Sequence, residues 1–166
     1  MKSKKLSALI GFIFAVLITA CSNDPQIADK TLYQAQQGQR DKYMPYLYGT
    51  WSGLQVFDDN LMAMSTRLKL SSDGTFEMAD TLLERKTPQD SWQKKDCKYN
   101  DMRRGNWELV CKRNDSDNDV IETYLMLDER HQPSAYSVQY ILFHDVDALK
   151  LHIDLVPLTE LIKVTE

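Results

Sequence analysis

Histidine and acidic residues gather at two points of the chain where their spacing could hold a metal ion. His144 begins the sequence His-Asp-Val-Asp, residues 144–147, which offers nitrogen and oxygen ligands. Residues 115–119, Asp-Ser-Asp-Asn-Asp, have the acidic spacing with which calcium loops begin. The calcium pattern then fails, because Val120 stands where glycine is needed and Met126 where a bidentate acid is needed. Tight turns also favour Asp for local hydrogen bonds, so we expect no metal ion and no other cofactor.

The chain contains none of the short motifs that mark common catalytic sites. It has no serine in a G-x-S-x-G setting, no H-E-x-x-H, no P-loop and no G-x-G-x-x-G. The other histidines are His131 and His152, and no arrangement of residues supplies a nucleophile with a base. We therefore expect a protein that is not an enzyme.

The N-terminus has the arrangement of an export signal. Three lysines lie within the first five residues, residues 6–18 are uncharged, and the next charge is Asp24. The apolar run is shorter than the roughly 20 residues that a membrane-spanning helix needs. Residues 1–20 are therefore predicted to be a signal peptide.

The end of this signal, Ile-Thr-Ala-Cys at residues 18–21, resembles the lipobox of bacterial lipoproteins. That resemblance implies cleavage after residue 20 and lipid attachment at Cys21, and two or more acyl chains make a stable membrane anchor. Ser22 follows the cysteine, which in Gram-negative lipoproteins resembles export to the outer membrane. We expect an outer-membrane, lipid-anchored protein whose domain lies in the periplasm.

Cys97 and Cys111 remain once Cys21 is assigned to the lipid. Two cysteines in an oxidising compartment should pair, and closing a loop of about 15 residues contributes about 3 kcal/mol in the chain-entropy model. No histidine lies nearby and there is no C-x-x-C, which argues against zinc and redox sites. The sequence therefore predicts a disulfide between Cys97 and Cys111.

Charge and length narrow the class of protein further. The chain has 20 basic and 24 acidic residues, and the predicted signal peptide removes only basic ones. Such an acidic protein has no electrostatic reason to bind nucleic acid. Residues 21–40 are polar and rich in glutamine, and are predicted to be a flexible tether with a short helical stretch around Ala28–Gln37. Residues 41–166 are predicted to form one domain.

Hydrophobic and polar residues alternate along short segments, which indicates half-buried β-strands. Residues 62–70 and 75–83 make the clearest pair, because the Ser-Ser-Asp-Gly between them is a tight turn whose glycine accepts a positive φ. The alternation points Leu68, Phe76 and Met78 inward. Further strands are expected at residues 120–127, 135–143, 148–155 and 157–166. In residues 148–155 four side chains are expected to point inward: Leu149, Leu151, Ile153 and Leu155.

Residues 91–99 and 105–112 are predicted to form another hairpin, with its tip near Met102–Gly105. Cys97 and Cys111 are equally distant from that tip, so the hairpin would place them opposite each other. The whole pattern gives eight or nine short strands without a long amphipathic helix between them. The predicted fold is all-β, either an antiparallel barrel, which leaves no exposed edge, or an antiparallel β-sandwich.

Gly-Thr-Trp at residues 49–51 resembles the G-x-W motif with which the first strand of lipocalins and related calycins begins. Leu47 before it and the segment 68–78 after it are also similar to small bacterial lipocalin-like domains. The resemblance implies an eight- to nine-stranded barrel in which Trp51 closes one end. Lipocalins often carry a late arginine that stacks on this tryptophan, and Lys163 is its counterpart here.

We expect a non-catalytic protein whose barrel binds a small apolar ligand at the membrane surface. Four methionines would suit an adaptable pocket: Met62, Met64, Met78 and Met126. The alternative is a protein–protein role as an accessory, assembly or inhibitor lipoprotein of the cell envelope. That role would need an exposed apolar patch, for which there are four aromatic candidates: Tyr43, Tyr46, Tyr48 and Trp92.

Overall fold

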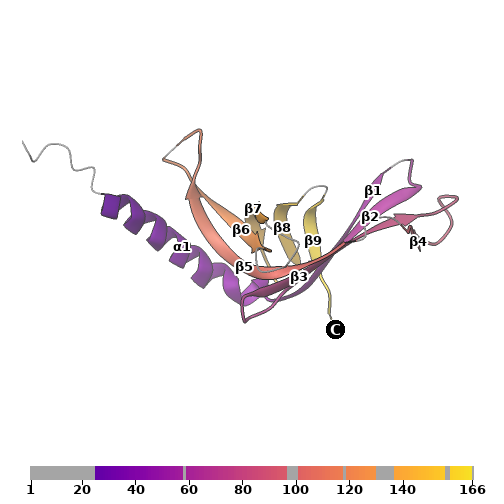
Figure 1. The fold of residues 1–166 in the computed structure, drawn as a ribbon, viewed down its shortest axis with the longest axis horizontal. Helices are drawn as coiled ribbons and strands as arrows, with labels where there is room; N and C mark the ends of the chain where they lie inside the picture. Colours follow the sequence, from indigo (N-terminus) through magenta and orange to yellow (C-terminus); the bar gives the residue numbers. More distant parts are fainter. Residues whose placement is uncertain are drawn as a thin grey trace, which may run out of the picture. The chain divides into compact units, whose positions relative to one another are not determined.

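The computed structural model describes residues 25–57, 59–96, 101–117, 119–129, 137–155 and 158–165. It shows there one helix, α1 (Pro25–Leu47), followed by strands in chain order (Figure 1). The strands are β1 (Gly49–Phe57), β2 (Met62–Leu70), β3 (Thr75–Glu84), β4 (Gln93–Lys94), β5 (Asp101–Arg113), β6 (Ile121–Asp128), β7 (Val138–Val146), β8 (Lys150–Leu155) and β9 (Leu158–Lys163). Within the described residues, α1 lacks the run of apolar residues that a membrane-crossing helix requires.

Eight of the strands close into an antiparallel barrel, and β4 adds to it beside β3. Each barrel strand pairs with the next barrel strand along the chain, and β1 closes the ring against β9. The closing seam pairs Trp51 with Lys163 and Ser52 with Ile162. The prediction of an all-β antiparallel barrel is thus confirmed over the sandwich, and the barrel is consistent with a lipocalin-like fold.

The predicted hairpin of residues 62–70 and 75–83 is confirmed as β2 and β3. Leu68 pairs with Met78 and Leu70 with Phe76, and all four side chains are buried. Gly74 has a φ of 82°, the conformation that the Asp-Gly turn requires. The turn therefore fixes a register that turns the apolar side chains of both strands to one face.

The second predicted hairpin is wrong, because β5 runs without interruption through its expected tip. Asp101 to Asn106 pairs with β3, and Asn106 to Arg113 pairs with β6. A Cβ atom on Gly105 would lie 2.0 Å from the backbone oxygen of Asp128. The glycine therefore marks a close approach of two backbones where the strand changes partners, rather than a turn.

The predicted strands in the C-terminal half are confirmed with shifted bounds. Strand β7 continues through His144 to Val146, so the turn begins three residues later than His144. Leu149 lies in that turn with 62% of its surface exposed, which contradicts its predicted inward position. The other three aliphatic residues of this segment are buried as expected: Leu151, Ile153 and Leu155.

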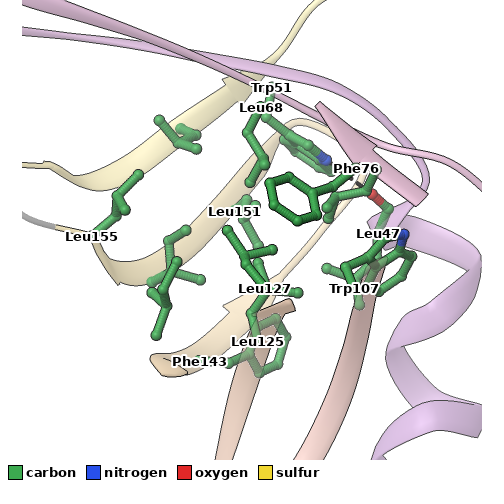
Figure 2. Close-up of a cluster of buried hydrophobic side chains, with 14 of the residues drawn as sticks. Leu47, Trp51, Leu68, Phe76, Trp107, Leu125, Leu127, Phe143, Leu151 and Leu155 are labelled. Carbon is green, nitrogen blue, oxygen red and sulfur yellow. Dashed lines mark hydrogen bonds between the residues drawn. The ribbon is translucent and has the colours of Figure 1, made fainter. Parts of the chain in front are cut away.

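The barrel interior is filled on one side by a continuous apolar cluster, whose members come from α1 and from all eight barrel strands (Figure 2). Trp51 and Leu47 have no exposed surface, and the indole Nε1 of Trp51 donates a hydrogen bond of 2.9 Å to the carbonyl of Leu47. Lys163 lies above the Trp51 ring, 4.9 Å from its centre, and donates to the Tyr46 carbonyl. The lysine thus occupies the place that the lipocalin resemblance assigned to an arginine.

Part of the predicted tether is helical. The chain divides into two compact units, residues 1–31 and 32–166, so α1 from Leu32 onward belongs to the unit of the barrel. Arg40 forms an ion pair with Glu108 of β5 (3.1 Å), and the ring of Tyr43 meets Phe143 edge to face. Residues 32–40 therefore belong to a helix that packs one face on the sheet, and are not a solvated linker alone.

Candidate functional site

The two acidic segments serve local turns in the structure. One oxygen of Asp147 accepts hydrogen bonds from the backbone N–H groups of Leu149 (2.6 Å) and Lys150 (2.8 Å), and these bonds lower the pKa of its carboxyl group. His144 is exposed and contacts Asp154 across the neighbouring strand at 2.8 Å. In the part of the chain that the structure describes, no three metal-ligating side chains come together.

The turn at residues 115–119 is also held by side-chain oxygens that accept hydrogen bonds from backbone N–H groups. The side chain of Asn114 accepts hydrogen bonds from the N–H groups of Ser116 and Asp117, and Asp117 accepts one from Asp119. These short loops of hydrogen bonds are typical of Asx turns. Their acceptor oxygens close the turn between β5 and β6.

Two of the three predicted cysteine sites lie outside the described residues, namely Cys21 and Cys97. Cys111 is buried in β5 and carries a free thiol, 3.7 Å from the hydroxyl of Thr123. The predicted pairing of Cys111 with Cys97 is not tested, because Cys97 lies outside the described residues, but the hairpin that would place the two cysteines opposite each other is not formed. Lipid attachment at Cys21 stays a prediction.

The methionines and aromatic residues singled out from the sequence do not form one site. Met78 alone of the four methionines is fully buried, while Met126 stands on the outer face, where it pairs with Tyr140. Tyr43 is buried, Tyr48 packs on Trp107, and the ring of Trp92 lies under the guanidinium of Arg85. The predicted aromatic patch is therefore not present as such, although Tyr46 remains 47% exposed.

A polar cluster that the sequence did not suggest lies inside the barrel, at the end away from α1. Its centre is Arg103 on β5, which has the same inward parity as Trp107 and Leu109. The guanidinium donates to Asp80 of β3 (2.9 Å) and to the side-chain oxygen of Gln139 on β7 (3.1 Å). We call Thr66, Asp80, Arg103, Glu129 and Gln139 the Arg103 cluster.

The two carboxylates of the Arg103 cluster are held differently. Asp80 is tightly bound, because its other oxygen accepts the hydroxyl of Thr66 at 2.6 Å. Glu129 is only 6% exposed, and its side-chain contacts with the described residues are long, 3.7 Å to Arg103 and 3.4 Å to the hydroxyl of Ser137. Glu129 therefore keeps the capacity to accept a stronger hydrogen bond than it makes here.

The charges of the cluster do not cancel. Among the described residues one guanidinium faces two carboxylates, which is a formal surplus of one negative charge at the edge of the apolar interior. The side chains of Arg103 and Asp80 are each 24% exposed, so solvent reaches this end of the barrel. A hydrogen-bond donor or a cation that reached this end of the barrel could bind the Glu129 carboxylate beside the apolar core.

The sequence holds a signal for this cluster that was missed. Asp80 interrupts an otherwise apolar inward series in β3, namely Phe76, Met78 and Leu82, at a position where a charged residue is costly unless it is paired. The sequence does not reveal its partner Arg103, because the alternation pattern places that residue at a hairpin tip and not in a strand.

Among the described residues, two open clefts are found on the outside of the barrel, and Arg103 lines neither of them. One of about 230 Å³ lies over β1, β2 and β3 and is lined by Thr50, Arg67, Lys69, Glu77, Met78, Ala79 and Met102. The other, of about 530 Å³, lies at the loop between β3 and β4, between Glu84 and Gln93. Comparison with known proteins finds no matching family, no matching curated protein and no matching solved structure.

Proposed function

We propose that this protein is a non-catalytic, lipid-anchored protein of the outer membrane whose barrel binds a small apolar ligand carrying a hydrogen-bond donor or a cationic group. The observation that carries the proposal is Glu129, a nearly buried carboxylate whose two contacts with described residues are long, in the polar Arg103 cluster beside the apolar core. Ligand sites combine apolar walls with a few placed polar groups in this way.

The charge of the cluster determines which polar group fits. An amine gains a charge-assisted hydrogen bond to Glu129, and such bonds are roughly twice as strong as neutral ones. A carboxylate ligand would instead meet the surplus negative charge. The expected order of affinity for ligands with the same apolar body is therefore amine, then alcohol, then acid.

This order can be measured with three probes, dodecylamine, dodecanol and dodecanoic acid, by calorimetric titration of the full chain below micelle formation. We expect saturable binding of one dodecylamine, at least about tenfold tighter than dodecanoic acid, since tenfold corresponds to about 1.4 kcal/mol. No saturable binding of any probe, or tightest binding of the acid, would refute the proposal.

A matched pair of variants separates the interior charge from the net charge of the protein. Glu129→Gln removes the inner carboxylate, and Glu77→Gln removes one from the outer face, where it pairs with Arg104. We expect Glu129→Gln to weaken dodecylamine binding roughly five- to tenfold, by about 1.0–1.4 kcal/mol, while Glu77→Gln leaves it within twofold. Equal effects would show surface attraction instead of an interior site.

The membrane part of the proposal rests on the lipobox resemblance at Cys21. Mass spectrometry of the protein extracted from its producing cell should find acyl chains on an N-terminal residue 21. Cys21→Ser should move the protein from the membrane fraction to the soluble fraction, because the acyl chains supply the anchoring free energy. An unmodified N-terminus at another residue would overturn this part alone.

A second function, docking on an envelope protein, is favoured by one outer surface. Tyr124 and Tyr140 meet edge to face at 6.3 Å on β6 and β7, and Lys112 lies over the Tyr140 ring. Aromatic residues beside a basic group are typical of interface anchors. Photo-crosslinking from position 140 in the producing cell, compared with position 154 on the charged face of β8, would test this role.

A further inference from the structure

Strand β1 leaves the barrel wall halfway along its length. It pairs with β2 from Gly49 to Phe57, but the structure pairs it with β9 only at Trp51 and Ser52. In Figure 1, β1 and β2 continue past β9. Among the described strands, the segment Gly53–Phe57 therefore has a partner on one side and an open edge on the other; we call it the β1 edge.

The hydrogen bonds of β1 show which backbone groups face this open edge. The N–H of Val164 donates to the carbonyl of Thr50 at 2.8 Å, so Thr50 faces the β9 side. Because residues of an antiparallel strand alternate between its two neighbours, Leu54 and Val56 face the same side. Their N–H and C=O groups thus point to the open edge, while Gly53, Gln55 and Phe57 bond to β2.

The β1 edge lacks the features that usually protect an edge strand. Its sequence, Gly-Leu-Gln-Val-Phe, has no charged residue and no proline. Leu54 and Phe57 are 45% and 39% exposed. Natural edges of this kind are normally shortened, charged or covered, because they pair readily with another strand.

We propose that the β1 edge pairs in antiparallel fashion with the β1 edge of a second copy, with Gln55 on the two-fold axis. This register places Leu54 opposite Val56 of the second copy, so that both open residues of each strand exchange N–H···O=C bonds. A register shifted by two residues would use Ser52, which β9 already occupies, or would run beyond Phe57. The open backbone groups therefore select one register.

The side chains fit the same register. Phe57 faces Gly53 of the second copy, so the largest side chain meets the residue that has none. Leu54 and Val56 form apolar cross-strand pairs, and the two Gln55 amides can hydrogen-bond to each other across the axis. The segment has no charged side chain, so the paired strands place no like charges opposite each other.

The interface is small, because it contains five residues of each strand. Interfaces below roughly 1,200 Å² belong to weak and transient complexes. The dimer is therefore one that exchanges with monomer, and its population rises with concentration.

Cysteine cross-linking tests the register in the full chain with the native cysteines replaced, as Cys21→Ser, Cys97→Ser and Cys111→Ala. Two Gln55 residues form a non-hydrogen-bonded pair, whose Cα atoms lie about 4.5 Å apart, within the range of a disulfide. We expect Gln55→Cys to give a disulfide dimer under mild oxidation. Leu54→Cys alone should not, because two Leu54 residues would be diagonal neighbours roughly 7–8 Å apart.

A mixture of Gly53→Cys and Phe57→Cys proteins should cross-link with each other more than either does with itself. Cross-linking that is equal at all these positions would indicate random collision and would overturn the register. An absence of cross-linking at position 55 would overturn the dimer.

A second measurement is sedimentation of the full chain with Cys21→Ser as its only change. The matched variants are Leu54→Lys on the edge and Leu149→Lys in the turn between β7 and β8, both at exposed leucines. We expect the mean mass to rise with concentration, Leu54→Lys to abolish the rise, and Leu149→Lys to leave it unchanged. A mass that stays monomeric throughout, or equal loss in both variants, contradicts the proposal.

Discussion

Arg103 shows how one residue inside a barrel determines what its neighbours can do. Its guanidinium lies 2.9 Å from a carboxylate oxygen of Asp80 but 3.7 Å from one of Glu129, so the ion pair with Asp80 is the tighter one. Its planar guanidinium has five N–H donors in a fixed arrangement, so it bonds to β3 and β7 at the same time. The arginine therefore stabilises the cluster while leaving Glu129 with spare acceptor capacity.

Arg103→Gln is expected to lower the free energy of unfolding by about 1–3 kcal/mol, because a part-buried carboxylate loses a charged partner. Urea unfolding measures this change directly. Arg104→Gln is the control, since Arg104 is the next residue, more than half exposed, and paired with Glu77 on the outer face. Its effect should stay within about 0.5 kcal/mol, as is usual for surface changes, and a similar loss in both variants would place Arg103 outside the barrel interior.

Asp147 contributes to the acid stability of the fold through the turn between β7 and β8. Its pKa is lowered from the ordinary value of 3.8 by hydrogen bonds from the N–H groups of Leu149 and Lys150. A lowered folded-state pKa adds stability above the unfolded value, and this stability is lost as the pH falls through the folded value. Asp147→Asn should therefore show a smaller fall in urea midpoint between about pH 5 and pH 2 than the unchanged protein. Asp119→Asn, in another turn, is the control, and an unchanged pH dependence in Asp147→Asn would refute the role.

At the scale of elements, β5 changes its pairing partner along its length. It pairs first with β3 and then with β6, and Gly105 lies at the change. A Cβ at this position would overlap the Asp128 carbonyl and come within 3.0 Å of the Phe76 ring. The bend of the sheet therefore requires glycine because of space, not because of its φ.

Gly105→Ala is expected to cost roughly 2–4 kcal/mol of stability, in the range of overpacked core sites. The control is Gly38→Ala in α1, where nothing lies within 4 Å of the new Cβ. That change should stabilise by about 0.4–1 kcal/mol, because alanine favours helix and restricts the unfolded chain. Thermal or urea unfolding of both variants checks the pair, and a neutral Gly105→Ala would mean that β5 and β6 are further apart.

The continuity of β5 also bears on the cysteines. The strand from Asp101 to Cys111 spans roughly 30 Å at about 3.3 Å per residue, while the link from Cys97 to Asp101 reaches at most about 14 Å. A disulfide requires Cα atoms within about 7 Å. With β5 intact, we expect Cys111 to remain a free thiol, and alkylation of the unfolded, unreduced protein followed by mass spectrometry should modify it. Protection of both Cys97 and Cys111 would show the disulfide and would mean that β5 is broken.

At the scale of the whole molecule, the barrel could be foreseen where local signals agree with the tertiary structure. Three local signals each predict one feature of the barrel. They are the Asp-Gly turn before Thr75, the alternation in β2 and β3, and the Gly-Thr-Trp sequence at the start of β1. The path of β5 could not be foreseen, because a glycine in a polar run has the same local signature in a turn and at a crowded bend. Arg103 was missed for the same reason.

The helix could be foreseen only in part. Between Leu32 and Arg40 its contacts with the sheet are polar ones, from Gln36 and Arg40 to Glu108, and its apolar contacts come only in the last turns, from Tyr43 and Leu47. Polar contacts leave no periodic apolar pattern in residues 32–40, so this part of the helix resembles a solvated tether in the sequence. A site formed by side chains from four strands is likewise invisible until the order of the strands is known.

The seam between β1 and β9 has a kinetic consequence. Every other barrel pairing joins strands that follow one another along the described chain, whereas Trp51 and Lys163 are more than a hundred residues apart. Contacts of such long range are slow to form, because closing the loop costs chain entropy before the contact adds any stability. The meander should therefore assemble first, and the seam should close after the rate-limiting step.

Lys163→Ala, which removes the contacts with Trp51 and Tyr46, should accordingly speed unfolding about fivefold while refolding keeps its rate. Leu68→Ala in the β2–β3 hairpin should instead slow refolding, and stopped-flow chevrons distinguish the two. If Lys163→Ala slowed refolding, the seam would belong to the folding nucleus. If instead the seam closes late, each opening of the pairing between β1 and β9 briefly turns the closed barrel into an open sheet with two free edges, and we expect sensitivity to proteases to rise with the frequency of such openings.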